Sequence, residues 1–126
     1  MTADTVLIAA LSGRGLAASA RRAGYLPLVA DAFGDSDTTE LATDARCVTD
    51  AARIGFRAKP AVSVLGQLEA AAPTPPIGLV LGSGFEDRPK LIAALSRRYR
   101  LIGNGAEAIA RAKNPAAFFP LLDTLG

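Results

Sequence analysis

"VLIAALSGRGLAASARRAGY", residues 6–25, decides the fold of this chain. The stretch opens with an apolar run, turns through two glycines and continues as an alanine-rich segment. An apolar run without polar alternation is typical of a central strand in a parallel sheet that helices cover on both faces. The stretch therefore predicts a strand, a tight turn and a helix. Its glycine turn either holds a phosphate group or only allows the chain to reverse.

The same alternation of short apolar runs and helical periods continues along the chain, which indicates stacked βαβ units. Strands are predicted at residues 5–10, 26–31, 46–50, 77–82 and 100–103. Amphipathic helices are predicted at 60–72 and 88–98, the second with Asp87 as its cap and Pro89 in its first turn. The expected fold is α/β, a three-layer Rossmann-like open parallel sheet of about five strands in the order 3-2-1-4-5.

Length and composition favour one globular domain. The chain has 126 residues, of which 50% are hydrophobic and 21% charged, and its net charge is +2. Residues 1–126 are therefore expected to form a single domain, with 105–126 as a helical tail. The arginines are spread along the sequence without interleaved aromatic residues, which argues against a nucleic acid partner. The first apolar run is too short to span a bilayer and no signal-peptide cleavage pattern follows it, so we expect no membrane partner. The single cysteine makes the cytoplasm the expected location.

The residue types restrict the chemistry. No histidine is present, which removes the most common general base and metal ligand. Cys47 is the single cysteine, so no internal disulfide is expected, and its place in the third strand predicts a buried, inert thiol. This composition favours binding over self-contained catalysis. We expect no catalytic residue and no metal ligand in this chain.

The glycine turn fits a dinucleotide-binding pattern. Gly13, Gly15 and Ala18 satisfy G-x-G-x-x-G/A after a strand and at the start of a helix, and Asp31 ends the second strand where a ribose-binding acid belongs. A free-standing NAD(P)-binding Rossmann domain is thus one hypothesis. The alternative is that a tight turn needs glycine for positive φ or close packing, and that acids are common at strand ends.

Three stretches carry a family resemblance. Residues 7–48 resemble the opening of ATP-grasp enzymes such as carboxyaminoimidazole ribonucleotide synthase, with a glycine turn, a helix ending in Arg-Arg, a strand ending in Asp and a third strand after a polar loop. The stretch "LIGNGAEAIARAKN", residues 101–114, resembles the segment before the ATP-grasp domain of biotin carboxylase and its relatives. The closing "FFPLLDTLG", residues 118–126, resembles the helix that leads into that domain.

The resemblance implies the N-terminal, preATP-grasp domain of a ligase that joins a carboxylate to an amine through an acyl phosphate. ATP and Mg²⁺ would then lie mostly in later domains, so neither is expected to bind tightly to this chain alone. A following ATP-grasp domain would be its partner, and a homodimer stays open. The family lysine that reaches ATP aligns with Asn114-Pro115, which leaves Lys113 as a displaced cofactor-binding candidate beside the alternative of a solvated surface lysine.

A ligand site is expected where strands 1 and 4 lie side by side, because ligands of open α/β sheets occupy the crevice where the strand order reverses. The loops at 12–15 and 82–89 are rich in glycine and offer backbone N–H groups at helix starts. Arg14 could bind a phosphate or carboxylate, Phe85 could present an apolar face and Glu86 could accept a hydrogen bond, or each could be a solvated or packed turn residue.

The expected ligand is a small anionic metabolite, whether the chain belongs to a ligase or is a small anion-binding regulatory module. The predicted substrate-binding residues are Ser12, Gly13, Arg14, Gly15, Asp31, Gly82, Ser83, Gly84, Phe85 and Glu86.

Overall fold

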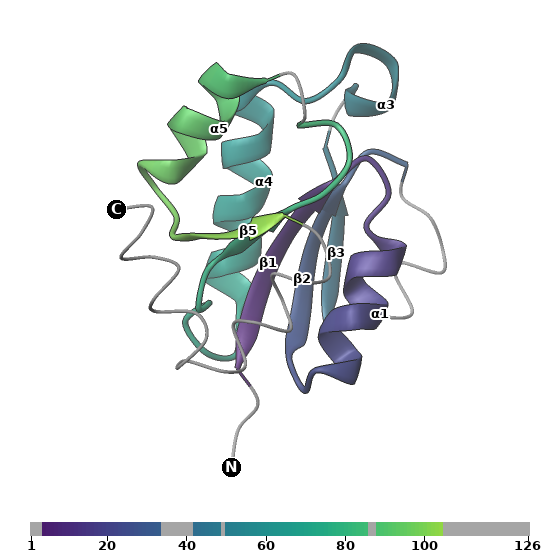
Figure 1. The fold of residues 1–126 in the computed structure, drawn as a ribbon, viewed down its shortest axis with the longest axis vertical. Coiled ribbons are helices and arrows are strands. Elements are labelled where there is room, and N and C mark those ends of the chain that lie inside the picture. Colours follow the sequence, from purple (N-terminus) through teal and green to yellow (C-terminus); the bar gives the residue numbers. More distant parts are fainter. Residues whose placement is uncertain (1–3, 34–41, 49, 86–87, 105–126) are drawn as a thin grey trace.

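The computed structural model describes residues 4–33, 42–48, 50–85 and 88–104. It contains a five-stranded, all-parallel open sheet in the order β3-β2-β1-β4-β5, which confirms the predicted fold (Figure 1). The strands are β1 (Thr5–Ala10), β2 (Leu26–Asp31), β3 (Asp44–Cys47), β4 (Leu79–Leu81) and β5 (Leu101–Asn104). The tail expected at 105–126, with Lys113, lies outside the described residues.

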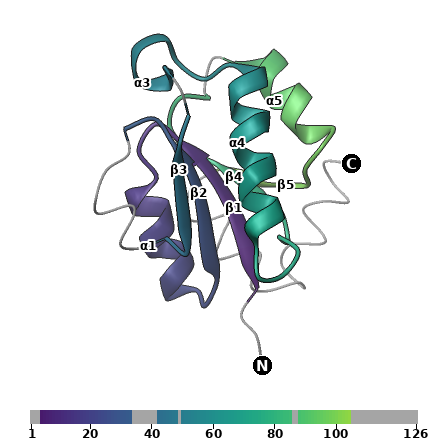
Figure 2. The same cartoon turned by 180° about the vertical axis from the view of Figure 1, so that it is seen from behind.

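Helices cover both faces of the sheet. They are α1 (Arg14–Arg22), α3 (Ala51–Ile54), α4 (Ala58–Ala71) and α5 (Pro89–Ser96). Helix α1 lies on one face, against β1 and β2, and α4 and α5 lie together on the other face (Figures 1 and 2). The short helix α3 is absent from the sequence-based prediction, because four residues are too few to show a helical period.

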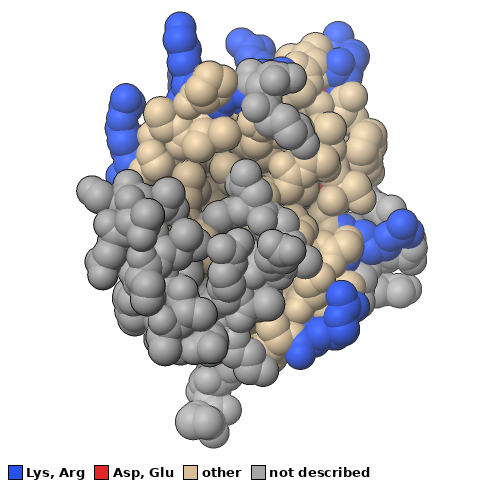
Figure 3. All heavy atoms as spheres, in the orientation of Figure 1, with Lys and Arg blue, Asp and Glu red and all other residues tan. Residues whose placement is uncertain are grey.

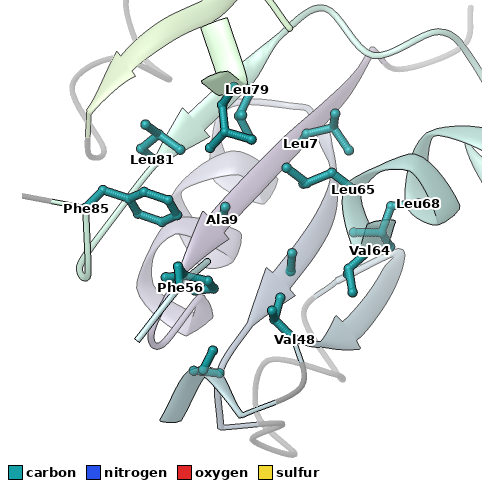
Figure 4. Packing of buried hydrophobic residues seen from close by; sticks show 14 of the residues in the cluster. Leu7, Ala9, Val48, Phe56, Val64, Leu65, Leu68, Leu79, Leu81 and Phe85 are labelled. Carbon is teal, nitrogen blue, oxygen red and sulfur yellow. The ribbon is translucent and has the colours of Figure 1, made fainter. Parts of the chain in front are cut away.

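The central strand β1 is buried along its whole length, as its unbroken apolar pattern predicts. Successive side chains alternate between two clusters, Leu7 and Ala9 facing α4 and Val6 and Ile8 facing α1. Figure 4 shows Leu7 pointing toward Leu65 of α4. β1 pairs with β2 from Thr5 to Ala10 and with β4 from Leu7 to Ala9. The predicted contact between strands 1 and 4 is confirmed.

Helix α1 packs closely on the sheet because its inner face is small. Ala17 and Ala20 are fully buried against Val6, Ile8 and Val29. Arg21 and Arg22 occupy the last turn, where their charge complements the helix dipole, as predicted.

Two sequence-based predictions are wrong at the local level. Cys47 is exposed, because it ends β3, an edge strand with sheet on one side only; its thiol lies 3.4 Å from the Ala32 carbonyl oxygen. The N-cap of α5 is Arg88 and not Asp87. Arg88 precedes a proline, which disfavours helical backbone, so the helix begins at Pro89.

Candidate functional site

The loops that follow β1 and β4 meet at the carboxyl edge of the sheet. The Leu11 N–H donates a hydrogen bond to the Ser83 carbonyl, with 2.9 Å between nitrogen and oxygen. The Gly82 N–H donates to the Ala9 carbonyl at 2.8 Å. These bonds continue the pairing of β1 with β4 beyond the strands, so the two loops begin side by side at Leu11 and Gly82. In an open α/β sheet this is the edge at which ligands bind.

The β4 loop is packed into the fold. A Cβ at Gly82 would lie 2.7 Å from the Ala10 Cβ and 2.8 Å from a Leu16 methyl group, closer than real Cβ atoms approach their neighbours. Gly84 has φ +100°, and a Cβ there would lie 2.8 Å from the Leu11 Cγ. Both glycines are therefore explained by close approach or by backbone conformation.

Phe85 belongs to the core. Its side chain is 2% exposed and its ring stacks on Phe56, with the ring centroids 4.7 Å apart and the planes 18° from parallel (Figure 4). Of the two roles that the sequence allowed for Phe85, the structure therefore shows the packed turn residue and not the ligand contact. It has no open face for a ligand in this structure.

The β1 loop is open by comparison. Ser12, Arg14 and Gly15 are exposed, and Gly13 is the buried N-cap of α1. Gly13 has φ −89°, so it does not adopt the positive φ that would by itself explain a glycine. Around Gly15, no neighbouring atom lies within 4 Å of where a Cβ would stand, the backbone of α1 itself excepted. The fold therefore does not require glycine at this position.

Helix α1 begins at this loop without a side-chain cap and without an acid in its first turn. Its first N–H groups and the positive end of its dipole consequently face the carboxyl edge of the sheet. Such an end suits a phosphate or a carboxylate.

Asp31 ends β2 at the same edge, as predicted, but its side chain is only 1% exposed. Its backbone carbonyl accepts a hydrogen bond from the Val48 N–H at 2.8 Å. The carboxylate is thus enclosed by the protein, whereas a ribose-binding acid has to reach a ligand hydroxyl. Glu86 lies outside the described residues.

A surface hollow that the sequence-based prediction missed lies beside the β4 loop, between the starts of α4 and α5. Its volume is about 490 Å³, and it is lined by Phe56, Arg57, Ala58, Arg88, Pro89, Lys90 and Leu91. The sequence signal was available, since Arg57, Lys59, Arg88 and Lys90 stand at the starts of two predicted helices, where acids are usual. Only the fold brings these two helix starts together.

Arg88 fixes one wall of this hollow. Its Nη1 donates to the Phe56 carbonyl at 2.7 Å and its Nη2 to the Ile54 carbonyl at 3.5 Å. Gly55, with φ +82°, leaves the space that this guanidinium fills. Arg88 therefore ties the start of α5 to the loop before α4.

Two tyrosines have shifted pKa values, and both lie at the opposite edge of the sheet, Tyr25 before β2 and Tyr99 before β5. Burial, and then the negative charge of Asp4, raises the pKa of Tyr25. Burial and the charge of Glu69 raise the pKa of Tyr99, while Arg98 opposes the increase. Neither tyrosine belongs to the candidate site.

Within the described ranges, no three acidic, cysteine or histidine side chains come together as a metal site. The helices in those ranges also include none that is long and apolar enough to cross a membrane. No protein-family model, curated protein or solved structure matches the chain significantly.

Proposed function

We propose that this chain is the substrate-binding N-terminal domain of an ATP-grasp carboxylate–amine ligase, and that the β1 loop binds the anionic part of a small metabolite. The resemblance of residues 7–48, 101–114 and 118–126 to preATP-grasp domains motivates the ligase assignment. The observed strand order 3-2-1-4-5 is compatible with it.

Gly15 is the observation that carries the binding proposal. The fold explains the glycines of the β4 loop, but it does not explain Gly15, whose missing side chain leaves open space at the start of α1. A ligand phosphate or carboxylate that binds at the first turn of this helix would explain why residue 15 is glycine, because a side chain there would obstruct the ligand. Arg14 lies next to Gly15 and is exposed, so it is the candidate side chain for a second contact.

The proposed role is binding and not catalysis. The described residues do not form a magnesium site, and the resemblance assigns ATP and Mg²⁺ mostly to later domains. We therefore assign no step of the ligase reaction to the described residues. The alternative function, an NAD(P)-binding Rossmann domain, requires an acid available to the ribose, and the burial of Asp31 counts against it.

A titration of the isotope-labelled chain with ribose 5-phosphate, succinate and NADH tests the binding proposal. One of the two small anions should shift the backbone amide signals of Ser12–Leu16. Gly15→Val should weaken this binding by about tenfold or more, because its side chain fills the space of the anion. Gly66→Val is the matched control, since Gly66 is also helical with nothing within 4 Å of a Cβ, but lies in α4. Equal losses in the two variants, or tight binding of NADH with enhanced cofactor fluorescence, would contradict the proposal.

The ligase assignment has a separate test. The source reading frame should continue past Gly126 into a segment with spaced lysines and a Glu/Asn metal pair, and the protein from that longer frame should release ADP in the presence of a carboxylate and an amine. A stop codon directly after Gly126 would refute the ligase assignment and favour an anion-binding module.

A further inference from the structure

Six cationic side chains that are distant in sequence gather on the face of the molecule that α4 and α5 form. They are Arg57 and Lys59 at the start of α4, Arg88 and Lys90 at the start of α5, and Arg97 and Arg98 just after α5. All are exposed except Arg88, which is half-buried. Figure 3 shows Lys and Arg side chains standing out from the surface around α5 and toward the top of α4.

Three adjoining hollows connect these cations. Beside the hollow of about 490 Å³ described above lies a second of about 520 Å³, which shares Arg57 and Ala58 with it. A third, of about 590 Å³, shares Ala58 and Lys59 with the second and extends to Arg97 and Arg98. We call the three together the α4–α5 groove. The first and the third are lined by residues of both helices and the second only by residues at the start of α4, and because neighbouring hollows share lining residues they favour an elongated ligand.

The floor of the α4–α5 groove is apolar and its rim is cationic. Ala58, Val62, Leu91 and Ala94 contribute lining between the charged residues. A ligand that matches this lining carries negative charges at its sides and an aliphatic group between them. A polypeptide segment in which Asp or Glu flanks a Leu or Val supplies both kinds of group.

Acidic side chains of the protein do not pair with these cations in the part of the chain that the structure describes. The ion pairs there include Arg46 with Asp44 and Arg53 with Asp50, and none joins a groove cation to a described acid. The first turns of α4 and α5 contain no acid, and their N-caps are arginines without a side-chain cap hydrogen bond. Cations at the positive end of a helix dipole are unfavourable, and carboxylates bound beside them would reverse this effect.

We propose that the α4–α5 groove binds an acidic segment of a partner protein in which an aliphatic residue is flanked by Asp or Glu. The inference is independent of the proposed function, which concerns the β1 loop. A nucleic acid fits less well, because single strands stack their bases on exposed aromatic rings and the one aromatic residue lining the groove, Phe56, is fully buried. An apolar floor also gives no advantage to a phosphate backbone.

Fluorescence anisotropy with a fluorescein-labelled peptide that repeats Asp-Asp-Leu tests this inference. The peptide should bind the protein, and its affinity should fall as the salt concentration rises. Peptides that repeat Asn-Asn-Leu or Asp-Asp-Ser should bind more weakly, by about tenfold and severalfold respectively, because the first removes the charges and the second the aliphatic contact.

The double variant K59E/R97E should lose about tenfold or more in affinity for the Asp-Asp-Leu peptide, since both residues line the third hollow. The matched control R21E/R22E makes the same change in charge on α1, on the other face of the sheet, and should stay within about twofold of the unmodified protein. Thermal melts check that both variants fold, and K59Q/R97Q gives the same comparison with a smaller change in charge.

Equal losses in the two charge-reversal variants would refute the groove as a specific site. Displacement of the labelled peptide by inorganic pyrophosphate or by a thymidine oligonucleotide at lower concentration than by the unlabelled peptide would also overturn the proposal. It would reassign the groove to a phosphate ligand in the first case and to single-stranded nucleic acid in the second.

Discussion

The two glycine-containing loops at the carboxyl edge of the sheet look alike in sequence, "SGRG" and "GSGF", but the fold uses them differently. In the β4 loop, Gly82 and Gly84 admit neighbouring side chains and Phe85 is part of the core. In the β1 loop, a Cβ at Gly15 would have no neighbouring atom within 4 Å outside the backbone of α1, and three of the four residues are exposed. The comparison teaches that a glycine gives little evidence for a ligand when neighbouring protein atoms already occupy the space that its side chain would need. A glycine with open space around it is more informative.

The largest effect that distinguishes the loops is expected from Phe85→Ala. This change removes a buried ring that stacks on Phe56 and should lower the free energy of unfolding by about 3–5 kcal/mol. Ser12→Ala in the β1 loop should change it by less than about 0.5 kcal/mol, because Ser12 is exposed. Urea denaturation of both variants measures the difference. A loss below about 1 kcal/mol for Phe85→Ala would mean that the ring is not part of the core in solution.

A smaller but more specific effect is expected from Gly84→Ala. The added Cβ would lie 2.8 Å from the Leu11 Cγ, and the backbone would have to keep φ +100° with a side chain present. Overpacking and backbone strain together predict a loss of about 2–4 kcal/mol in the free energy of unfolding.

Gly82→Ala separates the two causes of that loss. Gly82 has the close contacts, to Ala10 and Leu16, but not the positive φ, so about 1–3 kcal/mol is expected there. Chemical denaturation curves of the two variants would give the ranking. If Gly82→Ala is the more damaging change, packing and not backbone conformation limits the β4 loop.

The sequence predicts most of the sheet and only part of the site. The central position of β1 and β4 follows from their unbroken apolar runs, since strands buried on both faces have to be central, and the rest of the order follows the pattern of open α/β sheets. The exposure of Cys47 depends on β3 being the edge strand and ending there, which local composition does not show. The packing of Phe85 on Phe56 joins residues far apart in the chain. The α4–α5 groove likewise needs two separate segments, residues 56–63 and 88–98, to meet, and the cations at the two helix starts do not by themselves show that they do.

Among the glycine variants, the smallest stability effect is expected at Gly15, and its sign is opposite. Gly15 lies in the first turn of α1 without positive φ and with nothing within 4 Å of a Cβ, so Gly15→Ala should stabilise the protein by up to about 1 kcal/mol by restricting the unfolded chain. Gly66→Ala in α4 should do the same. The two variants should then differ in one property, because only Gly15→Ala should weaken binding of the small anion. A stabilised Gly15→Ala protein that retains full anion affinity would show that the open space at this glycine serves no ligand. A destabilised one would show that the β1 loop, like the β4 loop, requires its glycine for the fold.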